Sequence, residues 1–336
     1  MNSILVYCEL DGMRVADVSL ELLSKGRELA DELGVKLDAI GDNLASVPSQ
    51  VWPYGVDTLH LFEDNSLEYY TTQPHTAALC KLIQDEQPQI FLLGATVIGR
   101  DLGPRISATL RSGLTADCTA LEIGDYEDKK SGTKIENLLY SVRPAFGGNI
   151  VATIVNPYCR PQMATVREGV MPLKVVRPQD YEGETVHHNV DDYISAADRV
   201  VRIIERNVKP KENNLKSAPI VVAGGYGMGS KENFDMLYKL AHLLHGEVGA
   251  TRAAIDAGFS THDRQIGQTG LTVRPKVYIA CGISGQVQHI SGMQDSGIII
   301  SINSDPDAPI NAIADYVVTG SVEEVIPKLI NFYQQK

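Results

Sequence analysis

The chain has 336 residues, which exceeds one typical domain and is enough for two domains with large cores. Its 43% apolar and 21% charged residues are typical of an ordinary globular protein rather than a disordered or fibrous one. The net charge of -12 disfavours non-specific binding to nucleic acid, because an acidic surface repels phosphate groups.

The chain begins with a strand-like run at residues 3–8 and lacks the basic region and long apolar run of a signal peptide. No stretch reaches about 18 uninterrupted apolar residues, so no membrane insertion is expected. We therefore expect a cytoplasmic protein. The five cysteines are scattered without a C-x-x-C pair, which gives no support to a zinc or iron–sulfur site and favours buried free thiols.

The first half alternates strand-like and helical segments, which predicts an α/β domain with a mainly parallel sheet. The segments, in chain order, are residues 3–8 (strand), 19–33 (helix), 36–40 (strand), 58–62 (strand), 75–86 (helix) and 89–94 (strand). Gly34 is expected to stop the first helix, because glycine favours the position just after a helix C-terminus.

Residues 99–105 are charged and rich in glycine and proline, and a helix through Arg111 is expected after them. This pattern predicts a loop that either binds a partner or is braced internally by Arg–Asp pairs, and both readings stay open. A surface hairpin tip is expected at 129–132, and residues 138–142 and 150–155 are strand-like.

The region that joins the two halves is polar. His187 and His188 are interpreted as part of a solvated stretch, and residues 195–205 as a helix. A linker composition, with Pro, Lys and Asn, follows. We therefore expect a first α/β domain, a linker and a second α/β domain, at residues 1–205, 206–218 and 219–336.

The second half repeats the α/β pattern. Strands are expected at 220–223, 277–281, 298–303 and 315–319, and helices at 234–244, 251–257, 285–290 and 322–333. Three of the strand patterns run directly into loops of Gly, Ser or Asn. An open parallel sheet places its ligand-binding loops at the carboxyl ends of its strands, so these loops are the candidate site.

The loop at residues 224–229 is the most glycine-rich of the three. Glycines after a strand allow a backbone to approach a phosphate, which favours a dinucleotide site. However, the spacing is not a clean G-x-G-x-x-G, and no acidic residue ends a second strand about 20 residues later. A generic tight turn is as good an interpretation of this loop, and an NAD-dependent dehydrogenase is kept as an alternative function.

Other polar groups follow in the later loops. Thr251 and Arg252 open a short helix and could bind an anion, although a surface arginine is also consistent with the pattern. Ser284 and His289 flank a glycine-rich strand end, where His289 is either a donor to a ligand or a structural histidine. No G-x-S-x-G nucleophile elbow is present, and nothing in the sequence pairs Ser284 with an acid and a base.

Together these motifs resemble the alpha subunit of electron transfer flavoprotein. The resemblance covers the whole chain and is carried in the second half by long, ordered motifs, at residues 249–258, 266–270, 278–285 and 302–310. It implies a heterodimer with a beta subunit, against which the first domain packs, and FAD in the second domain. It implies an electron carrier between flavin dehydrogenases, such as acyl-CoA dehydrogenases, and a downstream acceptor.

The resemblance also implies roles for single residues. Arg252 would lie beside the flavin ring and raise its potential, and Thr269 would hydrogen-bond the ring edge. His289 would face the N1/O2 side and stabilise anionic reduced forms, and Asn303 would lie near the pyrophosphate or adenosine. The implied FAD-binding positions are Tyr226, Thr251, Arg252, Ile266, Gly267, Gln268, Thr269, Ser284, Gly285, Gln286, Val287, Gln288, His289, Asn303 and Ser321.

Two positions depart from the family pattern, which usually has arginine where this chain has Tyr226 and often aspartate where it has Ser321. These changes bear on the affinity for FAD and on its potential. Three alternatives to a simple carrier remain: a subunit of an NADH- and ferredoxin-linked bifurcating flavoprotein, an NAD-dependent dehydrogenase and a non-redox nucleotide-binding module.

Overall fold

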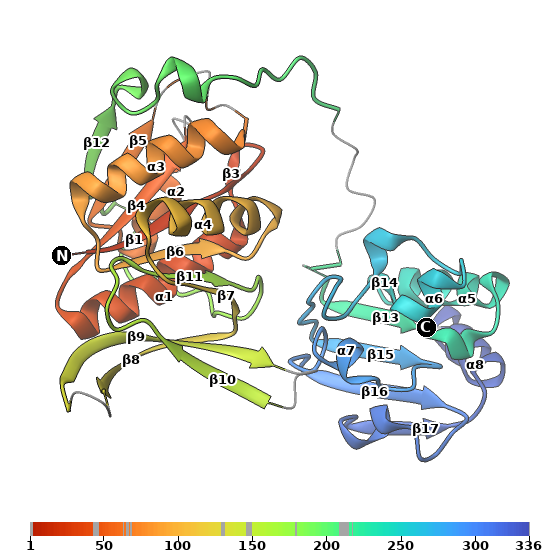
Figure 1. Cartoon of the computed structure of the whole chain (residues 1–336). Coiled ribbons are helices and arrows are strands. Elements are labelled where there is room, and N and C mark those ends of the chain that lie inside the picture. The colour runs from red at the N-terminus through yellow and green to blue at the C-terminus, as the bar shows by residue number, and fades with distance from the viewer. Residues whose placement is uncertain are drawn as a thin grey trace. The chain divides into compact units, whose positions relative to one another are not determined.

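The structure is a computed structural model, and its atoms group into two compact units, residues 1–206 and 207–336 (Figure 1). Each unit is described by itself. The structure describes every residue except 1–2, 43–46, 63, 65–66, 68, 129–131, 146–149, 179, 208–214, 217 and 336. Most of the expected linker and most of the expected hairpin tip at 129–132 therefore lie outside the described residues.

The first unit contains a seven-stranded, fully parallel sheet in the order β12-β5-β4-β1-β6-β11-β7. Its central strands are continuous apolar runs because both faces of the sheet are covered. The strands are β1 (Ser3–Cys8), β4 (Lys36–Asp42), β5 (Thr58–Phe62), β6 (Ile90–Gly94), β7 (Leu114–Cys118), β11 (Gln162–Val166) and β12 (Glu184–His188).

Helices cover this sheet, and a small antiparallel sheet in the order β10-β9-β8 extends from it. Gly34 adopts a left-handed conformation at the end of the first long helix, as expected. The remaining elements of the unit are β2 (Leu10–Asp11), β3 (Arg14–Val15), α1 (Asp17–Leu33), α2 (Val47–Val51), α3 (Thr72–Glu86), α4 (Val97–Leu110), β8 (Ala120–Glu127), β9 (Lys134–Ala145) and β10 (Ile150–Val155).

The loop predicted at 99–105 is wrong, because these residues lie inside helix α4. Thr96 caps the start of this helix, and its hydroxyl accepts a hydrogen bond from the Gly99 amide at 3.0 Å. Gly99 is needed for packing, since a Cβ there would lie 1.9 Å from the Gly94 carbonyl oxygen. The expected Arg–Asp brace exists as an ion pair between Arg105 and Asp101, one turn apart on the helix.

Two expectations for the region before the linker need correction, the solvated stretch only in part, because His187 is exposed as expected. His187 and His188 belong to edge strand β12, and the His188 ring bonds that of His60 at a nitrogen–nitrogen distance of 2.9 Å. The helix expected at 195–205 is reduced to a short 3-10 turn at Ala196–Asp198. The apolar residues Val200, Val201 and Ile204 are exposed, and a short helix is marginal unless it buries an apolar face.

The second unit contains a five-stranded parallel sheet in the order β14-β13-β15-β16-β17. The direction of winding reverses between β13 and β15, and this switch point opens a crevice at the carboxyl ends of the two strands. The elements are β13 (Ile220–Gly224), α5 (Lys231–Leu243), β14 (Glu247–Ala250), α6 (Arg252–Asp256), β15 (Val277–Cys281), α7 (Val287–Ile290), β16 (Ile298–Asn303), β17 (Tyr316–Thr319) and α8 (Val322–Gln334).

Both faces of this second sheet are packed. Helices α5 and α8 lie against each other over one face, where Phe234 and Ile326 are fully buried (Figure 1). The other face packs Tyr278, Met293 and Ile310. The α/β architecture predicted for both halves is therefore confirmed. Within the described residues, every helix is too short or too polar to span a bilayer.

Candidate functional site

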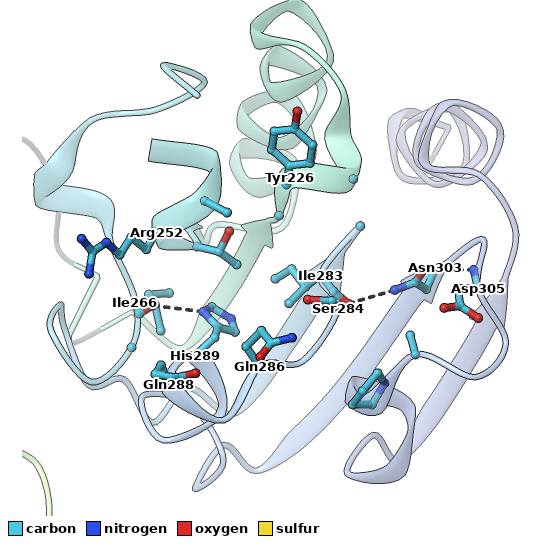
Figure 2. A pocket seen from close by; sticks show the side chains of 18 of the residues that line it. Tyr226, Arg252, Ile266, Ile283, Ser284, Gln286, Gln288, His289, Asn303 and Asp305 are labelled. Carbon is cyan, nitrogen blue, oxygen red and sulfur yellow. Dashed lines mark hydrogen bonds between the residues drawn. The ribbon is translucent and has the colours of Figure 1, made fainter. Parts of the chain in front are cut away.

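A cavity of about 720 Å³ lies at the carboxyl ends of the strands of the second unit (Figure 2). Its size falls within the range of small-molecule and cofactor sites, about 300–1,000 Å³. The loops that follow β13, β14, β15 and β16 all contribute to it, together with the start of α8. Its position at the switch point between β13 and β15 is the one that parallel α/β sheets use for ligands.

The glycine loops after β13 and β15 are packed against each other through their backbones. The amide of Gly225 donates to the Cys281 carbonyl at 2.9 Å, and that of Gly227 to the Gly282 carbonyl at 3.0 Å. A Cβ on Gly225 would lie 2.2 Å from the Gly282 oxygen. These glycines are therefore required for the contact between the two loops, which neither the dinucleotide interpretation nor the tight-turn interpretation anticipated.

Tyr226 lies between these glycines on the rim of the cavity and is 67% exposed. Its ring stacks on that of Phe259, with a centroid distance of 6.0 Å and an interplanar angle of 20°. An aromatic ring supported by Phe259 therefore stands at the position where the resemblance implies a cation.

Thr251 and Arg252 begin helix α6, as the sequence predicted. The Thr251 hydroxyl caps the helix by accepting from the Ala254 amide at 3.3 Å. The Arg252 side chain is 72% exposed and pairs with Asp256 at 3.5 Å, which makes this a weak surface ion pair. The remaining charged side chains among the described lining residues are the carboxylates of Asp305 and Glu323, so the charged groups that line the cavity are predominantly acidic.

His289 lines the cavity from α7 but is 94% buried. Its Nδ1 lies 3.0 Å from the Ile266 carbonyl oxygen, and its Nε2 lies 2.9 Å from the Tyr278 hydroxyl (Figure 2). Burial lowers the pKa of His289 to about 4, against a smaller opposing effect of the bond to Ile266. Both ring nitrogens therefore have partners within the protein.

The loop after Ile266 brings amide and hydroxyl groups to the same cavity. Gly267, with a φ of 141°, packs so closely that a Cβ would lie 2.7 Å from the Gln288 carbonyl oxygen. That oxygen also accepts from the Gln268 amide at 2.7 Å. The Thr269 hydroxyl accepts from the Gln265 side chain at 3.0 Å. The side chains of Gln268 and Thr269 are exposed at the edge of the cavity.

The loop after β15 presents Ser284 and Gln286 to the cavity, helix α7 presents Gln288, and all three side chains are exposed. Gly285 and Val287, which the sequence also predicted, do not line it. Gly285 is turned into the protein with a φ of 91°, and a Cβ there would lie 2.3 Å from the Ile310 nitrogen.

Asn303 and Ser321 line the far end of the cavity. The Asn303 amide donates to the Ile283 carbonyl at 2.8 Å, and its oxygen accepts from the Asp305 amide at 3.0 Å, so this side chain joins two site loops (Figure 2). Sequence reasoning missed several lining residues. Their signal was present in the Asp- and Pro-rich loop after β16 and in the first turn of α8: Asp305, Ala308, Pro309, Val322 and Glu323.

These groups fit a nucleotide cofactor. The cavity is large, and its wall offers side-chain amides and hydroxyls for polar ring edges, ribose and phosphate. Gly225, Gly227 and Gly282, whose loops are in backbone contact, line the same cavity. A parallel sheet with such a cavity at its switch point defines the class of nucleotide-binding α/β proteins.

Comparisons with known proteins identify the family within this class. A model of the electron transfer flavoprotein domain matches residues 4–192, and one of the electron transfer flavoprotein FAD-binding domain matches residues 214–294. The chain is 43% identical over 332 residues to the electron transfer flavoprotein subunit alpha of Thermoanaerobacterium thermosaccharolyticum, covering 98% of this chain and 97% of the relative.

Two further relatives agree over nearly their whole lengths. The electron transfer flavoprotein subunit alpha of Clostridium acetobutylicum is 43% identical over 332 residues, covering 97% of this chain and 95% of the relative. The acryloyl-CoA reductase electron transfer subunit beta of Anaerotignum propionicum is 39% identical over 351 residues, covering 98% and 95%.

The chain therefore belongs to the electron transfer flavoprotein alpha subunit family. It is an electron carrier, its cofactor is FAD, and its family implies a beta-subunit partner. When bound, FAD supplies one- and two-electron redox chemistry, and the protein supplies binding, orientation and electrostatics.

Proposed function

We propose that this chain, in a heterodimer with a beta subunit, accepts electrons from flavin dehydrogenases such as acyl-CoA dehydrogenases and passes them to a downstream acceptor in the cytoplasm. The relative named as an acryloyl-CoA reductase electron transfer subunit supports a partner enzyme that acts on an acyl-CoA, whichever way the electrons pass. We further propose that the first domain, residues 1–205, packs against the beta subunit, that residues 206–218 are a linker and that residues 219–336 hold the FAD.

The proposal includes the FAD-binding set named from the sequence. Its support is that every member except Gly285 and Val287 lines one cavity at the switch point. Arg252 is proposed to raise the flavin potential and Thr269 to bond the ring edge.

One observation disfavours general-base catalysis by the histidine of the site. A general base needs a free lone pair that can reach the reacting proton. Among the described residues that line the cavity, His289 is the only histidine, and both of its nitrogens bond protein groups. The polar side chains at the rim, such as Gln268 and Gln286, are exposed, so a cofactor edge there would be accessible to a partner protein.

The test is to purify the alpha and beta subunits together and record the visible spectrum before and after reduction. We expect flavin absorbance near roughly 370–450 nm, which an acyl-CoA dehydrogenase with its substrate bleaches. The dehydrogenase without substrate is the control. A flavin-free heterodimer, or a flavin that no acyl-CoA dehydrogenase reduces, would contradict the proposal.

A titration with NADH then separates the simple carrier from the bifurcating alternative. A simple carrier should contain one flavin per heterodimer that NADH leaves oxidised. Two flavins per heterodimer, reduced by NADH alone, would support the bifurcating flavoprotein in its place.

A further inference from the structure

One wall of the cavity is the loop at residues 304–308, which joins β16 to the 3-10 helix Pro309–Ala312. Ser304, Asp305 and Ala308 of this loop line the cavity (Figure 2). Residues 304–307 are exposed, so burial of their side chains does not hold the loop in place. A loop of this kind must be fixed by other contacts if it is to meet a ligand without a cost in conformational entropy.

The side chain of Asn311 supplies such contacts. Its Nδ2 donates to the carbonyl oxygens of Asp305, at 3.2 Å, and of Pro306, at 2.9 Å. Its Oδ1 accepts from the Ser301 hydroxyl at 2.7 Å. A primary amide has two N–H donors and one carbonyl acceptor, so this single side chain matches all three partners.

The bridge made by Asn311 rests on buried parts of the second unit. Ser301 lies in β16 and is completely buried. Ile310, the neighbour of Asn311, is also completely buried, and its amide donates to the Ser284 carbonyl at 3.1 Å. Asn311 therefore connects an exposed loop to the core and to the loop that presents Ser284 to the cavity.

The bonds of Asn311 complement those made within the loop. Asn303 accepts from the Asp305 amide at 3.0 Å, and the Asp305 carboxylate accepts from the Asp307 amide at 2.9 Å. Each of these turns spans only two residues and shapes the backbone locally. Asn303 thus holds the start of the loop, and Asn311 holds its middle at two consecutive carbonyl groups.

We infer that Asn311 is a positioning residue for the cofactor, which holds residues 304–308 in the shape of the cavity wall before FAD binds and so strengthens FAD binding. Asn311 acts through the loop backbone, since the described lining residues do not include it. This inference deepens the proposed FAD site and rests on it.

The test measures the FAD dissociation constant of the alpha–beta heterodimer from flavin fluorescence after dilution. Asn311→Ala removes both donors to the loop, so FAD should bind about tenfold more weakly, the effect of losing one or two neutral hydrogen bonds. Asn189→Ala is the matched control. Asn189 also caps a turn, by accepting from the Asp191 amide at 3.2 Å, but it lies in the first unit, so FAD affinity should not change.

Asn311→Asp supplies a readout that a merely structural role would not change. At pH 8 its carboxylate offers no donor to the two carbonyl oxygens, and the loop already carries the carboxylates of Asp305 and Asp307. FAD should therefore bind at least about tenfold more weakly than to the wild type. The same surroundings should raise the pKa of the new aspartate above its ordinary value of about 3.9.

Lowering the pH to 5 should partly restore FAD binding in Asn311→Asp, because the protonated acid can donate to one carbonyl oxygen. We expect its affinity relative to the wild type to recover by about threefold or more between pH 8 and pH 5. Asn311→Ala has no group that titrates, so its affinity relative to the wild type should be equal at both pH values. Circular dichroism and thermal unfolding check that each heterodimer is folded.

The alternatives give different results. An unchanged FAD dissociation constant in Asn311→Ala, even with a lower unfolding midpoint, would show that Asn311 serves only the fold and would overturn the inference. An affinity of Asn311→Asp, relative to the wild type, that is equal at pH 8 and pH 5 would overturn it too. If Asn311→Ala does not fold, this comparison within one preparation of Asn311→Asp decides. If the wild-type heterodimer binds no FAD, the proposed function itself has failed, and this inference fails with it.

Discussion

The contact between the two glycine loops is open to a direct test by the substitution Gly225→Ala. Gly225 has a φ of -100°, which alanine adopts without strain, so the effect comes only from the added Cβ. That atom would lie 2.2 Å from the Gly282 oxygen and 2.8 Å from the Ile283 Cα, and both neighbours are backbone. Because ordinary contacts begin near 3.4 Å, the two loops must separate by about 1 Å.

Overpacking of this kind costs about 1–3 kcal/mol. For a unit of this size we expect the unfolding midpoint to fall by about 5 °C or more. The forced movement of Gly282 and Ile283 also shifts Ser284 at the cavity wall, so FAD should bind about tenfold more weakly. Thermal unfolding of the heterodimer and a fluorescence titration with FAD measure the two effects.

Gly103→Ala in the interior of α4 is the matched control. Its Cβ would lie 3.3 Å from the Thr165 methyl group, a side-chain atom, and the helix gains up to about 1 kcal/mol from replacement of glycine. This variant should be as stable as the wild type or more so, with FAD affinity unchanged. If Gly225→Ala behaved in the same way, the close loop contact would not be what shapes the cavity.

Three further predictions concern charge. Arg252→Ala should lower the flavin midpoint potential by about 20 mV, equal to about 1 kcal/mol for two electrons, and a reductive titration identical to the wild type would contradict this. Tyr226→Arg should tighten FAD binding by about 0.5–1 kcal/mol, since it adds a cation to an acidic rim. The gain in affinity should shrink in high salt, and a gain that does not depend on salt would contradict this electrostatic explanation. Burial lowers the pKa of His60 to about 4, so between about pH 6.5 and pH 4 the unfolded chain binds more protons and stability falls as the pH falls. Burial raises the pKa of Asp38 to about 6, and this contributes a pH dependence of stability with the opposite sign over much of the same range. The measurement is therefore the difference in urea unfolding between the wild type and His60→Leu, and the variant should lose the part of the pH dependence that His60 contributes.

The central strands of both sheets could be predicted from the sequence because short, continuous apolar runs are typical of strands that are covered on both faces of a parallel sheet. Strands β1, β6 and β13 are such runs. The prediction missed β14, Glu247–Ala250, because its four residues are too few to show the hydrophobic periodicity of a strand. It also missed that His188 lies in a strand, because pairing with β5 and with His60 is decided by tertiary contacts and not by hydropathy.

The helical reading of 195–205 shows the opposite error. The sequence has apolar residues at helical spacing, including Val200, Val201 and Ile204, but these side chains are exposed in the described chain. The spacing of apolar residues indicates which face a helix would bury, but it does not indicate whether another part of the protein packs against that face. In contrast, Thr251 was read correctly as a helix start, because a capping hydroxyl is a local property of the sequence.

A glycine-rich loop after a strand is ambiguous in sequence because a missing Cβ can make room for a ligand or for another part of the same chain. At Gly225 and Gly282 the missing Cβ makes room for another part of the same chain, since the atoms that a Cβ would meet are backbone atoms of the facing loop. The polar groups of the site come instead from segments with weak local patterns, such as Gln268 and Ser284. The backbone contact nevertheless affects the polar groups. The loops after β13 and β15 both begin at the switch point, and their contact there fixes the positions of the side chains that follow in each loop. The glycines thus shape the cavity by allowing its two loops to pack together, and the residues that follow them supply the polar groups for the cofactor.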